Sequence, residues 1–339
     1  MQCVMVSRTG GPDVLCVEER QAPVPTAGQV LVDVRVCGVN FIDIYEREGQ
    51  YPVPVPFIPG SEGAGVVAAV ESGPSDVAVG DRVAWANVPG GGYASQVVLP
   101  AERVVPVPDE VDDETAVALM LQGLTAHYLC FSSYAVQPGD HILVHAAAGG
   151  VGALLTQMVR LRGGHVIATT STSAKAELAR QAGAEHVIDY TRRDVAAEVR
   201  RLTGGRGVAA VYDGVGRSTF EASLDSLRVR GTLVLYGAAS GPVPPLDPQV
   251  LNSKGSLYLT RPTLIHHIAD RAELLERACT VFGLATDGSL EVHIGGRYPL
   301  TAARQAHEDL ASRRTSGKLL LLPGRGRPLV EKAMASAGR

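Results

Sequence analysis

A glycine cluster in the middle of the chain has the residue types and spacing for phosphate binding. Gly149, Gly150 and Gly152 surround Val151, directly after an apolar run at 141–146 and at the start of an apolar helical segment at 152–161. Glycines there let the chain turn sharply, approach a pyrophosphate closely, and point helix N–H groups at it. Ala147 stands where the usual fingerprint has its first glycine. A tight turn without a ligand is the alternative, but the strand and helix around the cluster favour a dinucleotide site.

The segment about 20 residues further on lacks the acidic residue that grips the ribose of NAD. Residues 169–175 read TTSTSAK, with hydroxyls such as Ser171 and a cation at Lys175. A carboxylate would repel a 2′-phosphate, whereas hydroxyl groups, a helix N-terminus and a lysine favour one. The alternative is a lysine that is merely solvated on a helix. The pattern favours NADPH over NADH.

Other catalytic patterns are missing from the sequence. It contains no nucleotide-triphosphate P-loop, no G-x-S-x-G elbow and no H-E-x-x-H helix, and its nine histidines do not cluster at metal-ligand spacing. The isolated acids Glu62, Asp43 and Asp213 are predicted to be structural. The five cysteines are scattered without a C-x-x-C pair, which favours neither a disulfide framework nor a zinc knuckle and suggests a reducing, cytoplasmic setting.

Composition narrows the class further. The 339 residues are 45% hydrophobic, which supports sizeable cores, and the net charge of −4 argues against tight nucleic-acid binding. An almost uncharged stretch at 115–159 resembles a membrane span, but glycines and polar residues interrupt it, so we predict a buried core instead and no membrane association.

The elements that position these residues fall into two kinds. Short Val-rich runs at 30–36, 65–70, 82–86 and 95–99 predict strands of a barrel or partial barrel. A helical stretch is expected over 112–128, and six apolar strands then alternate with helices between 141 and 260. That alternation predicts an α/β fold with a doubly wound parallel sheet. After residue 262 the chain returns to mixed helices and strands, and its last residues are Gly-rich and basic.

Four segments together resemble one family: residues 40–43 (NFID), 122–125 (QGLT), 146–152 (AAAGGVG) and 251–256 (LNSKGS). They resemble the NADPH:quinone oxidoreductase and zeta-crystallin branch of the zinc-free medium-chain dehydrogenase/reductases. The resemblance implies a GroES-like, β-rich catalytic domain from residues 1–121 and 262–324, a Rossmann domain at 122–261, and a basic tail at 325–339. The zinc-ligand positions of metal-dependent relatives correspond to Asn40, Ser61 and about Leu121, so no metal is expected.

The resemblance also implies roles for individual residues. Asn40, Tyr45, Tyr51 and Thr125 are expected to line the nicotinamide end and to act as catalytic residues. The cofactor is expected to contact residues from both domains: Asn40, Tyr45, Thr125, Gly149, Gly150, Val151, Gly152, Ser171, Lys175, Tyr190, Val215, Gly216, Tyr236, Gly237, Ala238, Leu259, Thr260, Arg261 and Arg313. Ser171, Lys175, Tyr190 and Arg313 are expected around the 2′-phosphate. For Tyr45 and Tyr51, ordinary packing is the alternative.

The expected function is zinc-independent reduction of a quinone by NADPH, with Tyr51 as a hydrogen-bond donor to the reduced oxygen. Reduction of activated C=C bonds in enones or enoyl thioesters remains an alternative. A second class is a crystallin-like or AU-rich RNA-binding protein, for which the pairs at 192–193, 200–201 and 313–314 offer positive charge. A homodimer through the edge strand near 257–260 is expected from the resemblance, and nucleic-acid binding is not expected.

Overall fold

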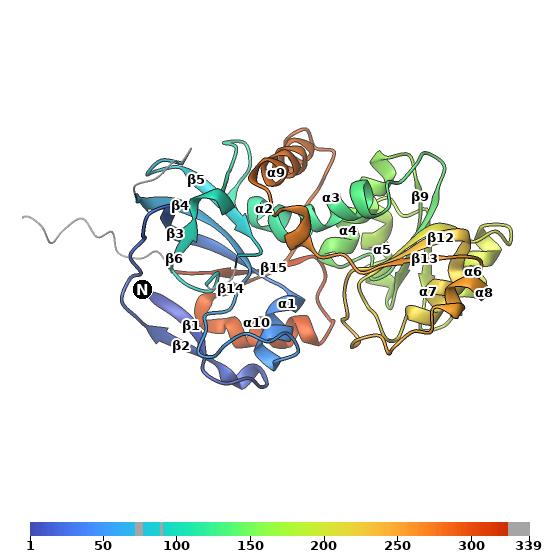
Figure 1. Cartoon of the computed structure of the whole chain (residues 1–339), viewed down its shortest axis with the longest axis horizontal. Helices are drawn as coiled ribbons and strands as arrows, with labels where there is room; N and C mark the ends of the chain where they lie inside the picture. The colour runs from blue at the N-terminus through green and yellow to red at the C-terminus, as the bar shows by residue number, and fades with distance from the viewer. Residues whose placement is uncertain (72–76, 89–90, 325–339) are drawn as a thin grey trace, which may run out of the picture.

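The computed structural model describes residues 1–71, 77–88 and 91–324. Two sheets lie at opposite ends of the molecule, and helices α2, α3 and α4 run between them (Figure 1). The predicted fold class, a β-rich unit beside a doubly wound parallel sheet, is confirmed. The predicted basic tail at 325–339 lies outside the described residues.

The first sheet combines strands from both ends of the chain. Its path is β14-β15-β3-β4-β5-β7, with β6 pairing the other part of β3. The strands are β3 (Gln29–Val39), β4 (Glu62–Val70), β5 (Arg82–Ala86), β6 (Gln96–Pro100), β7 (Val105–Pro106), β14 (Ile294–Pro299) and β15 (Lys318–Leu322). A separate antiparallel pair is formed by β1 (Gln2–Val6) and β2 (Leu15–Glu19). Valines on alternate positions of β3 enter its core, as the period of two predicted.

Four helices accompany this sheet: α1 (Phe41–Glu48), α2 (Asp113–Ala118), α9 (Arg271–Thr286) and α10 (Ala303–Ala311). Helix α1 begins directly after β3, and Asp43 in its first turn accepts a hydrogen bond from the Asn40 backbone N–H (2.8 Å). Gly49 ends the helix with φ +79°, a left-handed conformation that favours glycine. This sharp stop turns the chain back so that Tyr51 lies against Tyr45.

The second sheet is entirely parallel, in the order β10-β9-β8-β11-β12-β13. Its strands are β8 (His141–Val144), β9 (His165–Thr170), β10 (His186–Asp189), β11 (Val208–Asp213), β12 (Leu227–Leu235) and β13 (Tyr258–Thr260). The accompanying helices are α3 (Leu124–Tyr128), α4 (Gly150–Leu161), α5 (Ser173–Gln181), α6 (Val195–Leu202), α7 (Phe220–Ser226) and α8 (Gln249–Ser253). The strand order reverses between β8 and β11, which creates the crevice where such folds bind nucleotides.

Both faces of this sheet are buried. Ile142 and Val144 of β8 enter one core cluster, whereas Leu143 between them enters another. The near-continuous apolar strands in the sequence therefore reflect helices on both sides of the sheet.

One predicted helix differs from expectation. The stretch at 112–128 is not a uniform α-helix, because a π-helical segment, η3 (Leu119–Gly123), separates α2 from α3, and a second, η4 (Leu129–Ser133), follows. Short 3₁₀ turns complete the described chain: η1 (Pro12–Val14), η2 (Ala101–Arg103), η5 (Leu264–His267) and η6 (Leu300–Ala302). None of the helices in the described ranges is long and apolar enough to cross a membrane.

Candidate nucleotide and acceptor site

The glycine loop lies between β8 and α4, as its sequence predicted. Gly149 caps the helix, and a Cβ on Gly152 would lie 2.4 Å from the carbonyl oxygen of Ala146, so only glycine lets α4 pack this close. Ala146 has φ +51° and makes the turn that a glycine usually makes. The N-terminal turn of α4, including Gly150 and Val151, therefore offers its N–H groups at the crevice.

A buried polar network lies beside this loop, at the ends of the strands that lead to the site. His145 hydrogen-bonds Thr169 (3.0 Å) and Ser223 (3.1 Å), and Ser223 donates to Asp213 (2.8 Å). Burial lowers the pKa of His145, which keeps the imidazole neutral. The network ties together the ends of β8, β9 and β11, so the loops that follow these strands share one rigid base.

The wall beyond β11 and β12 depends on the same aspartate. Asp213 accepts hydrogen bonds from the backbone N–H groups of Val215 (2.8 Å) and Gly216 (3.0 Å). Gly237 packs so tightly that a Cβ there would lie 2.4 Å from the carbonyl oxygen of Gly214. The structure thus places Val215, Gly216, Tyr236, Gly237 and Ala238 at adjacent carboxyl ends of parallel strands, and Leu259, Thr260 and Arg261 at the end of β13.

Cationic and hydroxyl groups gather after β9 and β10. Ser171 follows β9, Lys175 lies in the first turn of α5, and Tyr190 follows β10 and is half exposed. The Lys175 ammonium donates to the carbonyl oxygen of Arg313 (2.5 Å), and the Arg313 guanidinium donates to the carbonyl oxygen of Ala239 (2.6 Å). The residues expected around a 2′-phosphate therefore come from two parts of the chain. Ser171, Lys175 and Tyr190 follow strands of the parallel sheet, Arg313 lies between α10 and β15, and none of the four is a carboxylate.

A cavity of about 670 Å³ lies between α1 and the carboxyl ends of β12 and β13. The cavity is lined by Tyr45, Gln50, Tyr51, Leu235, Gly237, Ala238, Gly241, Pro242, Val243 and Arg261. The rings of Tyr45 and Tyr51 meet edge to face, with centroids 5.3 Å apart. Burial raises the pKa of Tyr45 to about 12, so its phenol keeps its proton at neutral pH. Five of these lining residues were predicted to act in catalysis or cofactor binding. The other five carried no sequence signal: Gln50, Leu235, Gly241, Pro242 and Val243.

Asn40 and Thr125 are both buried, and neither lines this cavity within the described part of the chain. The Asn40 amide donates to Glu62 (2.6 Å) and accepts from the Lys318 ammonium (2.9 Å), while Lys318 also pairs directly with Glu62. The backbone N–H of Leu121 donates to Glu62 (2.7 Å). Glu62 is therefore held in a buried network, and its partner Lys318 was missed because 256 residues separate the two in sequence.

The three positions that the resemblance matches to zinc ligands of metal-dependent relatives all form hydrogen bonds within the protein. Asn40 and Leu121 bond to Glu62, and the Ser61 hydroxyl donates to Asp43 (2.9 Å). Within residues 1–71, 77–88 and 91–324, no group of three or more His, Cys, Asp or Glu side chains is arranged to hold a metal ion.

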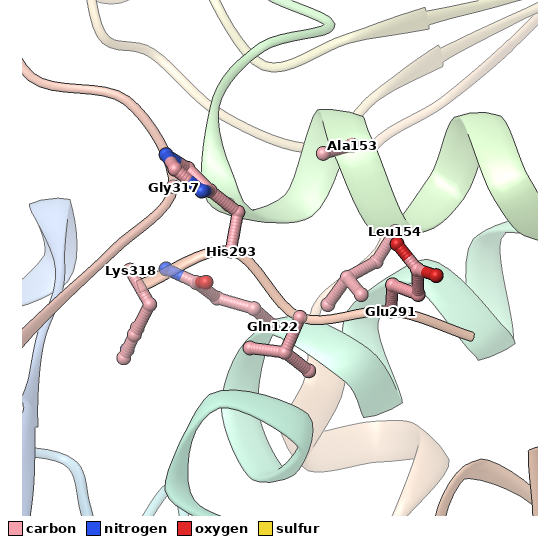
Figure 2. Close-up of a pocket in the computed structure, with 9 residues that line it drawn as sticks. Gln122, Ala153, Leu154, Glu291, His293, Gly317 and Lys318 are labelled. Atoms are coloured by element: carbon pink, nitrogen blue, oxygen red, sulfur yellow. The ribbon is translucent and has the colours of Figure 1, made fainter. Parts of the chain in front are cut away.

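The seam beside α4 is closed. Figure 2 shows Gln122, His293, Gly317 and Lys318 gathered near the start of α4, around a void of about 10 Å³, which has room for one water at most. A Cβ on Gly150 would lie 2.0 Å from the Gln122 amide oxygen, and Gly317 donates a backbone hydrogen bond to Ala148 (3.2 Å). The residue before β15 therefore contacts the glycine loop directly.

Comparisons with known proteins agree with this architecture. The profile of the alcohol dehydrogenase GroES-like domain matches residues 26–109, and that of the zinc-binding dehydrogenase family matches residues 150–276. A quinone oxidoreductase of Pseudomonas aeruginosa is 46% identical over 93% of this chain and 97% of its own. A 2-haloacrylate reductase of a Burkholderia species is 40% identical over 95% of this chain and 99% of its own.

Solved structures give the same result. Quinone oxidoreductase of Escherichia coli, complexed with NADPH, superposes with a TM-score of 0.93 at 40% identity, covering 95% of this chain and 100% of that one. A mycobacterial protein complexed with NADPH gives a TM-score of 0.92 at 50% identity, with the same coverage. The fold and site define a medium-chain dehydrogenase/reductase. The chain belongs to the quinone oxidoreductase branch of that family.

Proposed function

We propose that this protein is an NADPH-dependent quinone oxidoreductase, acting without zinc. The observation that carries the proposal is that three features lie at the same end of the parallel sheet. The glycine loop before α4, the cationic cluster around Lys175 and Arg313, and the cavity of about 670 Å³ all lie at the carboxyl ends of the strands. Doubly wound sheets bind nucleotides at that end.

The residues present fit NADPH. The N-terminal turn of α4 suits a pyrophosphate, and Ser171, Lys175, Tyr190 and Arg313 supply donors and positive charge for a 2′-phosphate. NADPH, when bound, supplies the hydride for the reaction. The wall at Val215, Gly216 and 236–238, with Leu259, Thr260 and Arg261, would hold the nicotinamide half.

The chain's own residues then orient the acceptor and supply a proton donor. The edge-to-face rings of Tyr45 and Tyr51 form an aromatic wall that suits a planar quinone. The Tyr51 hydroxyl accepts from Arg261 (3.4 Å), which leaves its own hydrogen available for the oxygen of the reduced acceptor. Tyr45, with its raised pKa, shapes the wall without ionising. Asn40 and Thr125 remain proposed residues of the nicotinamide end, and Asn40 also caps α1, the helix that carries Tyr45.

The test is a substrate panel on the purified protein. Oxidation of NADPH by benzoquinone and naphthoquinones, with much weaker use of NADH, is the expected result. An enzyme that uses neither nucleotide with any quinone, or that loses turnover when a chelator removes a stoichiometric metal, contradicts the proposal.

Reduction of an activated C=C bond is the second candidate activity. The same cavity accepts a flat enone, and hydride transfer makes an enolate where a quinone would make a hydroquinone anion. The Burkholderia relative is named a 2-haloacrylate reductase, which supports including 2-alkenals and halogenated acrylates in the panel.

Binding of AU-rich RNA is disfavoured by the local charges. Arg193 and Arg201 both pair with Glu198, and Arg192 pairs with Asp189. These ion pairs offset part of the positive charge at 192–193 and 200–201, and the net charge of −4 also disfavours tight nucleic-acid binding. A lens-like structural role, as a crystallin, has no specific observation in its favour.

Assembly and location form part of the proposal. Strand β13 is the edge of the parallel sheet, and Tyr258 on it and Val229 on β12 are 61% and 69% exposed. Pairing of two such edges in a homodimer would cover these side chains. All five cysteines are free, which supports a reducing cytoplasm. We also propose the domain boundaries at residues 121/122 and 261/262.

A further inference from the structure

Charge is distributed unevenly along the cavity between α1 and β13. Arg261 is the one charged side chain among the described residues that line it, and no lining residue is acidic. The other lining residues are aromatic, aliphatic, glycine or amide. A cation in a cleft with largely apolar walls draws anions into that cleft, because the low-dielectric walls focus its electric field.

Arg261 has no carboxylate partner among the described residues. Its guanidinium donates to the carbonyl oxygen of the adjacent Pro262 (3.2 Å) and to the Tyr51 hydroxyl (3.4 Å), and both bonds are long. The side chain is exposed. A guanidinium has five N–H donors in a planar fork, so most of its capacity to bind an anion is unused.

The phosphates of the nucleotide have other partners in the site. Lys175 and Arg313 are joined to each other at the carboxyl end of β9, where a 2′-phosphate is expected, and the pyrophosphate falls to the N-terminal turn of α4. Arg261 lies beside Tyr51, at the end of the cavity where we place the acceptor. Its backbone belongs to the proposed nicotinamide wall, but neither expected phosphate position needs its guanidinium.

We propose that the acceptor cavity is built for substrates that carry an anionic group, a carboxylate or sulfonate, which Arg261 binds while Tyr51 faces the reducible oxygen. This inference rests on the proposed function and specifies its substrate class. The anion takes the guanidinium edge now used for the weak contact to Tyr51, and the two parallel N–H donors orient the ring.

The experiment compares one naphthoquinone with the same naphthoquinone bearing a sulfonate. For the wild type, we expect kcat/KM to favour the sulfonated acceptor at low ionic strength and the preference to shrink as salt rises. Arg261→Gln should lower the preference about tenfold, mainly through KM, and Arg261→Lys should restore part of it. Arg8→Gln removes an exposed charge elsewhere and should leave kcat/KM for both acceptors unchanged.

Direct binding separates this inference from the proposed function. Calorimetry on the NADPH-loaded protein should show naphthalenesulfonate binding about tenfold more weakly to Arg261→Gln, with naphthol unchanged. An unchanged ratio between the paired ligands overturns the inference, as does an equal loss for both with a raised KM for NADPH, which would assign Arg261 to the cofactor. A wild type that binds the sulfonate through Arg261 but reduces no quinone refutes only the proposed activity.

Discussion

Replacing Lys318 by methionine should test the buried ion pair behind the site. Lys318 and Glu62 are 1% and 0% exposed, and Glu62 would keep only the hydrogen bonds from Asn40 and the Leu121 backbone. Leaving a buried carboxylate without its counter-ion costs about 3–5 kcal/mol, because neither water nor an opposite charge then stabilises it. Lys318→Met should therefore lower the free energy of unfolding by about that amount.

The matched variants are Glu62→Gln and the double variant that combines Lys318→Met with Glu62→Gln. Because the double variant leaves no unpaired charge, it should lose less than the sum of the two single losses, with a coupling free energy of about 2 kcal/mol. Urea unfolding followed by the fluorescence of Trp85 measures this, since the single tryptophan is buried in the same sheet, against Gly63 next to Glu62. A loss below about 1 kcal/mol for Lys318→Met, or additive losses, would refute the reasoning.

Three further predictions concern the cofactor, the acceptor and pH. Lys175→Ala should weaken NADPH binding about tenfold and leave NADH binding unchanged; equal losses in a fluorescence titration would remove Lys175 from the 2′-phosphate site. Tyr51→Phe should lower kcat about a hundredfold with the Kd for NADPH unchanged, and unaltered turnover would exclude the hydroxyl from the mechanism. Burial and Arg47 lower the pKa of His307 to about 3, so the unfolded chain takes up the proton first and stability falls as pH drops below about 6.5. The stability advantage of wild type over His307→Gln should shrink by about 2 kcal/mol between pH 7 and pH 5, and a constant difference would contradict the assignment.

Local patterns were enough to predict the parallel sheet and its glycine loop. Each strand from β8 to β13 overlaps one of the six apolar strands predicted between 141 and 260, because burial on both faces requires such runs. The glycine at 152 could be recognised since its role, close packing of α4 on Ala146, depends on a short segment.

The acceptor cavity and the network behind it could not be predicted in the same way. Lys318, Glu62 and Asn40 meet only because β15 returns to pair with β3, and no period in the sequence specifies that pairing. The π-helical turn at 119–123 was missed because its apolar spacing is compatible with an ordinary helix, while its N–H at Leu121 bonds to Glu62 instead.

The place of β15 within the first sheet has a consequence for biosynthesis. It lies between β14 and β3, although it is the last strand of the described chain. Until residues 318–322 have been translated, the edge of β3 that β15 will cover stays open, whereas every strand of the parallel sheet has already been made by residue 260. The nucleotide-binding half can thus form on the nascent chain before the first sheet is completed by β15.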